Sequence, residues 1–143
     1  MFLGTHYPKL DDKGRFFLPA KFRDALDDGF VITKNYDHCL AIYTREDFVR
    51  KVTPVSSAPD SLKRVRQYQR QLGGSASEGV ADKQGRVTIP QQLRDYAGLD
   101  RDIVVVGSVN RIEIWDAETW ATYDSENEED FADMDGEIVP PVT

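Results

Sequence analysis

The sequence is poor in cysteine and histidine, and its apolar residues form no long run. Its 143 residues include one cysteine, Cys39, and two histidines, His6 and His38. A single cysteine excludes an intrachain disulfide framework and agrees with a reducing compartment. The histidines do not combine with Cys39 at a spacing typical of zinc ligands. Since there is neither a membrane-spanning apolar run nor a leader peptide at residues 1–10, we expect a cytoplasmic protein without a membrane partner.

Recognisable catalytic motifs are also missing. The sequence contains no GxSxG elbow, phosphate-binding Walker loop or dinucleotide fingerprint. The carboxylates of Asp11, Asp12 and Asp82 are the main candidates for an acid–base or metal pair, but each lies in a predicted turn where aspartate has a backbone role. We therefore interpret the chain as a non-enzymatic protein, and expect no cofactor, no metal and no small-molecule substrate.

Charge is distributed unevenly along the chain. The formal net charge is −7, but residues 1–98 hold 16 Lys and Arg against 12 Asp and Glu, a net of +4. Residues 99–143 hold 2 against 13, a net of −11. A moderately basic body with a strongly acidic end indicates either a polyanionic partner or a solvating tail.

A sequence repeat is the strongest feature that is present. The stretch DDKGRFFLPAKFRD, residues 11–24, returns as DKQGRVTIPQQLRD at residues 82–95. The offset of 71 residues pairs a glycine, two arginines, a proline and two aspartates. After one extra residue near Gly98, an offset of 72 continues the match, with Val31 paired to Ile103 and Tyr43 paired to Trp115. The chain therefore contains two copies of one unit.

Each copy predicts the same elements: a short strand, a glycine turn, a strand that ends at proline, a short helix, a β-hairpin and a closing helix. In the first copy the ranges are 15–18, 20–26, 30–34 and 39–43, and in the second they are 86–89, 91–97, 103–106 and 111–115. Thr44 and Asp116 are placed to cap the closing helices.

These elements divide the chain into four segments. We predict a first repeat at 1–52, a linker with a basic helix at 53–75, a second repeat at 76–123 and a tail at 124–143. The linker begins with a Pro- and Ser-rich connection over residues 52–60. The tail combines a dense acidic run with few apolar residues, which is typical of a disordered segment.

The repeated turn is the candidate functional site. Asp11 and Asp82 can bond to their own backbone to start each turn, and Gly14 and Gly85 can supply a positive φ. Geometry alone explains those residue types, but it does not explain an arginine after the glycine in both copies. The planar fork of Arg15 or Arg86 can bind a phosphate or lie against guanine in the major groove. For Arg23 and Arg94, which precede aspartates in the short helices, a structural ion pair and a DNA contact are equally open.

Taken together, these motifs resemble the MraZ family of transcriptional regulators. The resemblance rests on DDKGR and DKQGR, on the opening MF.G, and on the stretches LGGSASE, LRDYAGL and VGSVNRIEIWD. It implies an α+β fold of two tandem AbrB/SpoVT-like repeats, swapped-hairpin and β-barrel-like, related by a pseudo-two-fold axis and carrying short helices. It also implies a nucleoid-associated DNA-binding regulator of the division and cell-wall gene cluster, which acts as a homo-oligomeric ring on direct repeats in its own promoter.

The family motif maps onto the residues of both turns. It gives Asp11, Gly14, Asp82 and Gly85 as loop-shaping residues. The residues implied to contact double-stranded DNA are Lys13, Arg15, Lys83 and Arg86. The motif differs here in two ways, since Phe16 replaces the more usual leucine and Gln84 stands where the first turn has Lys13. The alternative function is an antitoxin-like or scaffold module that binds protein, because swapped-hairpin domains also occur in antitoxins.

Overall fold

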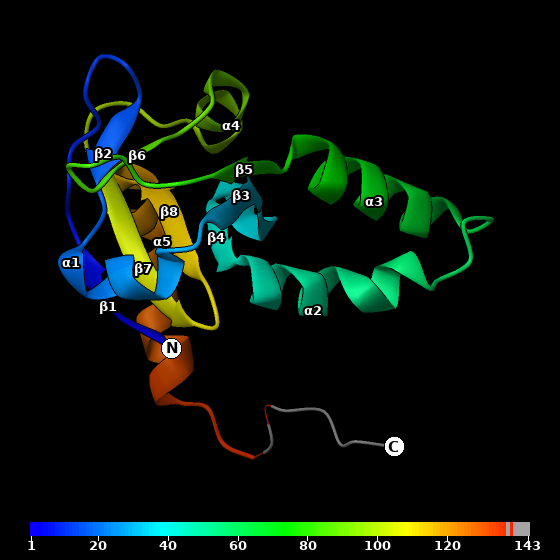
Figure 1. Cartoon of the computed structure of the whole chain (residues 1–143). Helices are drawn as coiled ribbons and strands as arrows, with labels where there is room; N and C mark the ends of the chain where they lie inside the picture. The colour runs from blue at the N-terminus through cyan, green and yellow to red at the C-terminus, as the bar shows by residue number, and fades with distance from the viewer. Residues whose placement is uncertain (137, 139–143) are drawn as a thin grey trace.

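The chain is an α+β protein built on one antiparallel sheet (Figure 1). The computed structural model describes residues 1–136 and residue 138. Six strands form the sheet in the order β1-β7-β8-β4-β3-β5, and β2 and β6 form a separate pair. The strands are β1 (Phe2–His6), β2 (Arg15–Phe17), β3 (Phe30–Lys34), β4 (Leu40–Thr44), β5 (Ser77–Gly79), β6 (Arg86–Thr88), β7 (Ile103–Val109) and β8 (Ile112–Asp116).

The strands of the two copies pair in matching registers. In the β2–β6 pair, Phe16 lies opposite Val87, its own counterpart at the offset of 71. In the sheet, Ala41 of β4 lies opposite Glu113 of β8, its counterpart at the offset of 72. The sheet order is balanced in the same way, since each copy contributes a hairpin next to the centre and a short strand at one edge.

One apolar core joins both copies. Alternate residues of the strands point into it, and the opposite face of the central strands is covered as well, where Cys39, Val104 and Trp115 form a second, smaller buried cluster. The strand pair and the residues directly after it contribute Phe16, Leu18, Val87 and Ile89, all at most 1% exposed, and the central strands contribute Leu40, Ile42, Ile112 and Ile114. Neither copy closes this core by itself, so the two form one folding unit.

Two short helices follow the strand pair. The predicted helix at 20–26 is divided into α1 (Ala20–Arg23) and a 3₁₀ turn, η1 (Asp24–Leu26), whereas α4 (Gln91–Ala97) is one helix. It ends at Gly98, which has the left-handed φ of 62°. Pro19 and Pro90 are the residues that immediately precede these helices, so each proline stands between a strand, which ends at Phe17 or Thr88, and the start of a helix.

Two longer helices form an arm that extends from the sheet (Figure 1). They are α2 (Arg45–Ser56), capped by Thr44 as predicted, and α3 (Lys63–Ser75). The prediction of a connection from residue 52 is wrong for its first half, because α2 continues through Pro54 to Ser56. A proline near the end of a helix removes only one backbone hydrogen bond, and here the helix ends two residues later. We call α2 and α3 the arm.

The last helix corrects the predicted tail. α5 (Ala117–Ala132) begins at Asp116, whose carboxylate accepts from the Thr119 amide. Its first turns pack on β8, where the Trp120 ring meets Trp115 edge-on and the Tyr123 ring meets it at a tilt. The acidic segment was predicted to be disordered from residue 124, but residues 124–132 continue this helix. The helix is nucleated by its cap and its aromatic contacts, which composition alone does not reveal. The prediction for residues 137 and 139–143 lies outside the described residues.

No helix within the described part of the chain is long and apolar enough to span a bilayer. The 3₁₀ turn η2 (Tyr36–His38) completes the list of elements and joins β3 to β4.

Candidate nucleic-acid interface

The first turn is held together by one aspartate. The Oδ1 atom of Asp11 accepts hydrogen bonds from the amides of Lys13 and Arg15, both at 2.9 Å. The Oδ2 atom accepts from Nε of Arg15 at 2.8 Å. The backbone closes the turn, since the Gly14 amide donates to the Asp11 carbonyl at 3.0 Å, and Gly14 has a φ of 76°. The Asp11 carboxylate therefore both fixes the backbone of the turn and orients the Arg15 side chain.

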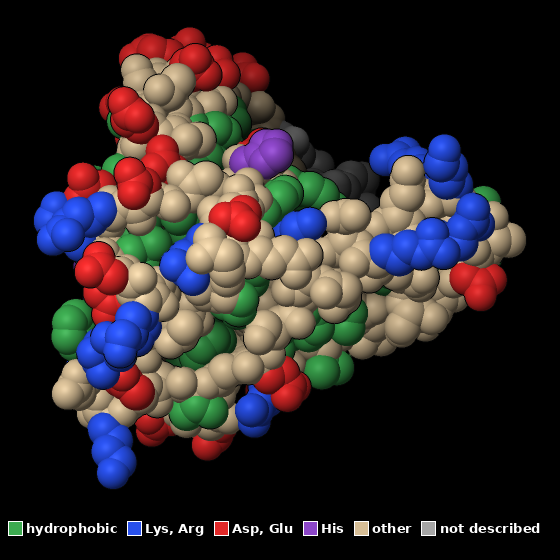
Figure 2. All heavy atoms as spheres, turned by 90° about the horizontal axis from the view of Figure 1, so that it is seen from above, with side chains coloured by type: hydrophobic (Ala, Val, Ile, Leu, Met, Phe, Trp, Pro, Cys, Tyr) green, Lys and Arg blue, Asp and Glu red, His purple; other side chains and the backbone are tan. Residues whose placement is uncertain are grey.

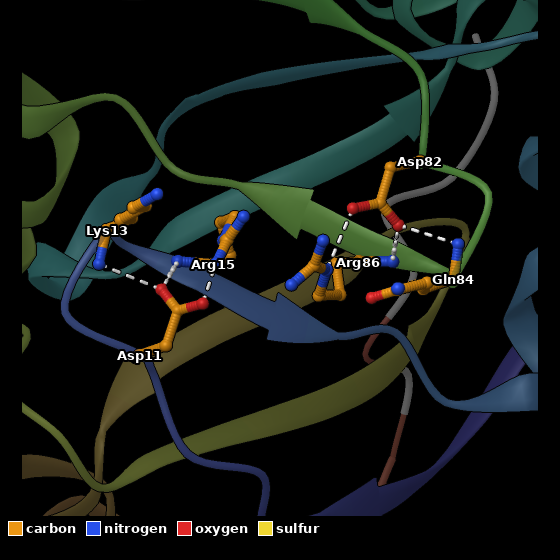
Figure 3. A network of polar contacts seen from close by, with 6 residues as sticks. All are labelled: Asp11, Lys13, Arg15, Asp82, Gln84 and Arg86. Carbon is orange, nitrogen blue, oxygen red and sulfur yellow. Dashed lines mark hydrogen bonds and ion pairs between the residues drawn. The ribbon is translucent and has the colours of Figure 1, made fainter.

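The second turn repeats this arrangement (Figure 3). Asp82 accepts from the amides of Gln84 and Arg86 at 2.9 and 2.8 Å, and from Nε of Arg86 at 2.8 Å. Gly85 has a φ of 81°, and its amide donates to the Asp82 carbonyl at 2.9 Å. The loop-shaping geometry predicted for Asp11, Gly14, Asp82 and Gly85 is present in both copies.

These bonds stabilise the charged form of each aspartate. The pKa of Asp11 lies below its usual value of 3.8, mainly because the Arg15 amide donates a hydrogen bond to the carboxylate. Desolvation opposes this shift, whereas the hydrogen bonds from the Arg15 side chain and the Lys13 amide lower the pKa further. The pKa of Asp82 is lowered by the matching donors, the Arg86 amide first. A carboxylate that is ionised and already occupied by donors is poorly suited to general acid–base catalysis.

The strand pair brings the two arginines to one face. Arg15 lies opposite Thr88, and Arg86 lies opposite Phe17. Residues that are diagonal neighbours in an antiparallel pair are about 7–8 Å apart and point to the same side. The side chains of the two arginines are only 27% and 24% exposed, because each lies against its aspartate. Among the described residues, the terminal guanidinium nitrogens of both have no hydrogen-bond partner.

Comparison with known proteins identifies the family. The chain matches the model described as "MraZ protein, putative antitoxin-like" over residues 1–71 and again over 73–139. A protein of Cutibacterium acnes named transcriptional regulator MraZ is 59% identical over 134 residues, which is 94% of each chain. Proteins of the same name from Thermobifida fusca and Saccharopolyspora erythraea are 52% and 51% identical over 99% of each chain. The chain belongs to the MraZ family. The resemblance inferred from the motifs is therefore confirmed.

The two lysines of the MraZ motif do not occupy equivalent positions. Lys13 is the residue before Gly14, where the second turn has Gln84, while Lys83 corresponds to Asp12. Both lysines are exposed. The structure thus places all four basic residues of the turns beside one strand pair, with the charge arranged differently on the two sides.

Two further arginines support the turns, and their role was not predicted. The guanidinium of Arg94, from the second copy, lies against Gly14 of the first, where an added Cβ would be only 2.5 Å from its Cζ. Arg23 lies in the same way against Gly85, and its Nε donates to the Leu18 carbonyl at 2.9 Å. Neither arginine forms an ion pair within the described residues, so that hypothesis is not supported. The only signal in the sequence was their repetition at the offset of 71.

The remaining chemically reactive residues do not form a site. Cys39 is buried, and burial followed by the charge of Glu113 raises its thiol pKa to about 12. Nδ1 of His38 lies 3.3 Å from the Tyr96 carbonyl, in the turn between β3 and β4. In the part of the chain that the structure describes, no group of three His, Cys, Asp or Glu residues could hold a metal ion.

Proposed function

We propose that this protein is a sequence-specific DNA-binding regulator of transcription, and that Arg15 and Arg86 read the DNA. The observation that carries the proposal is the attachment of each arginine to its turn. Nε is held by an aspartate at 2.8 Å, and the outer nitrogens have no partner among the described residues. An arginine fixed in this way presents a planar donor pair, which suits guanine O6 and N7 or a phosphate.

The neighbouring lysines supply the sequence-independent part of binding. Lys13 and Lys83 are exposed on the turns next to the arginines, where they can neutralise backbone phosphates. Phe17 is 56% exposed and lies across from Arg86 on the same face, so an apolar contact to a thymine methyl group is available there.

The resemblance extends this proposal to the target and the assembly. The two copies are tandem AbrB/SpoVT-like swapped-hairpin repeats about a pseudo-two-fold axis, which the matching registers and the double family match support. The protein acts in the cytoplasm, on the nucleoid, at direct repeats in its own promoter within the division and cell-wall cluster. Because one chain offers only two turns, repeated DNA elements favour a ring of several chains that raises their effective concentration.

Selection of binding sites from random DNA, followed by gel shifts, tests the proposal. We expect Arg15→Ala and Arg86→Ala each to weaken binding to the selected site by about 1–3 kcal/mol, as for loss of a bidentate base contact. Arg15→Lys keeps the charge but loses the fork, so it should weaken the selected site more than scrambled DNA.

Arg70→Ala is the matched control, because it removes one positive charge from the arm, away from the turns. It should leave the ratio of selected to scrambled binding unchanged. If both turn variants keep the parental preference for the selected site and an unchanged circular dichroism spectrum, the arginines do not read DNA. Binding to a protein partner with no preference among DNA sequences would instead favour the antitoxin-like alternative.

A further inference from the structure

The second half of α5 is a helix that packs on no other element among residues 1–136. We call residues 124–134 the acidic segment; in it, every residue but the half-buried Asn127 is exposed. Its large apolar side chains are also exposed to solvent: Phe131 is 75% exposed and Met134 is 57% exposed. The first half of α5 packs on Trp115, but the acidic segment projects beyond the sheet (Figure 1).

The charge of this segment is unfavourable for an isolated helix. Asp124 and Glu128 are four residues apart, as are Glu126 and Asp130, and like charges at this spacing destabilise a helix. The acidic residues also lie at the C-terminal end, where the helix dipole favours cations, and α5 has no basic residue in its last turn. Arg111 is the last Lys or Arg in the sequence. A basic surface from elsewhere would remove both penalties.

A groove with the complementary character lies between the arm and the sheet. It has a volume of about 360 Å³, and we call it the arm groove. Three cations and three aromatic rings contribute to its lining: Lys34, Lys51, Arg64, Tyr36, Tyr68 and Tyr96. Lys34 lies 5.0 Å from the ring centre of Tyr96, and the Tyr36 and Tyr68 rings are 6.5 Å apart. No Asp or Glu lines the groove within the described residues, and none of its cations forms an ion pair there.

The acidic segment and the arm leave the molecule in different directions. In Figure 1, the arm extends to one side of the sheet and α5 descends behind it. Figure 2 shows acidic side chains gathered at one corner and basic side chains gathered on the arm at the opposite end. The two charged regions are therefore presented outward, where two copies of the chain can pair them.

We propose that the acidic segment of one copy docks into the arm groove of a second copy. Phe131 enters among the three tyrosines, and Glu128, one turn earlier on the same face, faces Lys51 and Arg64. This inference rests on the self-association proposed above, and it specifies which two surfaces of neighbouring copies meet. The contact is heterologous, because it joins different surfaces of the two chains. Repeating a heterologous contact produces a closed ring when the rotation between neighbouring chains divides a full turn evenly.

Charge reversal in the full-length protein tests the contact. Glu128→Lys with Glu129→Lys makes the acidic segment repel the groove, and Lys51→Glu with Arg64→Glu makes the groove repel the segment. By light scattering at low salt, we expect either double variant to need at least about tenfold more protein than the parent to assemble, since each replaces the attraction of Glu128 to Lys51 and Arg64 by repulsion. Phe131→Ala should also weaken assembly, and its effect should persist at high salt.

Mixing gives the decisive measurement. In an equimolar mixture of the two double variants, the basic segment of one meets the acidic groove of the other, and the unchanged surfaces match as well. The mixture should assemble where each variant alone does not. Lys63→Glu with Arg70→Glu is the matched control, because both residues belong to α3 and neither lines the groove. It should change the assembly concentration by less than about threefold.

Four outcomes would overturn the proposal. Unchanged masses in every variant would assign the groove to another occupant, such as the chain's own C-terminal residues or a foreign acidic partner. A mixture that stays at the mass of its components would show that the two surfaces do not meet, and a control as impaired as the groove variant would show only a general charge effect. If the parent protein itself is monomeric, the proposed assembly fails as well. The turns are unchanged throughout, so gel shifts report separately on DNA reading.

Discussion

The two turns, residues 11–15 and 82–86, have the same hydrogen bonds but different charges. Each has one aspartate that accepts two amides and one arginine Nε, and corresponding distances differ by no more than 0.1 Å. In contrast, the two residues between aspartate and glycine are Asp12 and Lys13 in the first turn and Lys83 and Gln84 in the second. Backbone shape and arginine orientation therefore depend on three residues, while the charge beside them varies independently.

The supports of the turns differ as well. Arg23, against Gly85, donates its Nε to the Leu18 carbonyl, whereas Nε of Arg94, against Gly14, is buried and has no partner within the described residues. The first turn is thus held by a guanidinium with an unsatisfied donor. An unsatisfied buried donor costs about 1–3 kcal/mol. Two turns with the same internal hydrogen bonds are therefore packed against arginines whose own hydrogen bonding differs.

The largest effect is expected from the glycines. Gly14→Ala and Gly85→Ala each force a side chain into a positive φ and against an arginine, so we expect a loss of about 2–4 kcal/mol in the free energy of unfolding. Gly85→Ala should cost about 1 kcal/mol more, because it displaces the arginine that has a hydrogen bond to lose. Urea unfolding at one fixed protein concentration measures both.

Gly98→Ala is the matched control for the glycines. Gly98 also has a left-handed φ, 62°, but an added Cβ there meets nothing within 4 Å. It should cost only the backbone strain, about 1–2 kcal/mol. Equal losses at all three glycines would mean that the contact with the arginines does not constrain the turns.

A smaller effect is expected from the aspartates, and it depends on pH. The pKa values of Asp11 and Asp82 are lowered in the folded protein, so each stabilises the fold at pH values above the usual pKa of 3.8. This contribution is lost as the pH falls below 3.8 and through the lower pKa of the folded state. Asp11→Asn and Asp82→Asn should lower the free energy of unfolding at neutral pH. The difference from the parent should shrink below about pH 4.

Urea unfolding at a series of pH values from neutral to about 3 provides the measurement. Because the two turns have the same donors, the two variants should follow the same curve. Asp12→Asn is the control, since Asp12 accepts no hydrogen bond among the described residues and should leave the acid dependence nearly intact. A clear difference between the curves of the two main variants would break the equivalence of the turns.

The turns could be predicted from the sequence because their structure is local. Asp, Gly and Arg within five residues specify the loop, and the repeat made the prediction stronger than one copy would allow. The packing of Arg94 on Gly14 could not be predicted, because it joins residues 80 positions apart across the two copies. The helix at 124–132 was missed for a different reason, since its composition favoured disorder. The start of α5 is anchored by the Asp116 cap and by contacts of Trp115 with the nearby Trp120 and Tyr123, which composition does not show.

The smallest expected effect concerns the residue before each glycine. Lys13→Gln should make the dependence of log affinity on log salt shallower by about 0.9 for each subunit that contacts DNA, because one fewer phosphate is neutralised. If the second turn approaches the backbone in the same way, Gln84→Lys should make it steeper by a similar amount, and the double variant should return to the parental slope. Gel shifts with selected and scrambled DNA over a salt series give these slopes, and Lys63→Gln on the arm is the control. The selected-to-scrambled ratio should stay constant in all of them, since a lysine on phosphate carries no base information. A steeper slope after Gln84→Lys requires that both turns lie against the DNA. An unchanged slope would mean that only the first turn contacts the DNA backbone, so that two turns of matching geometry differ in binding.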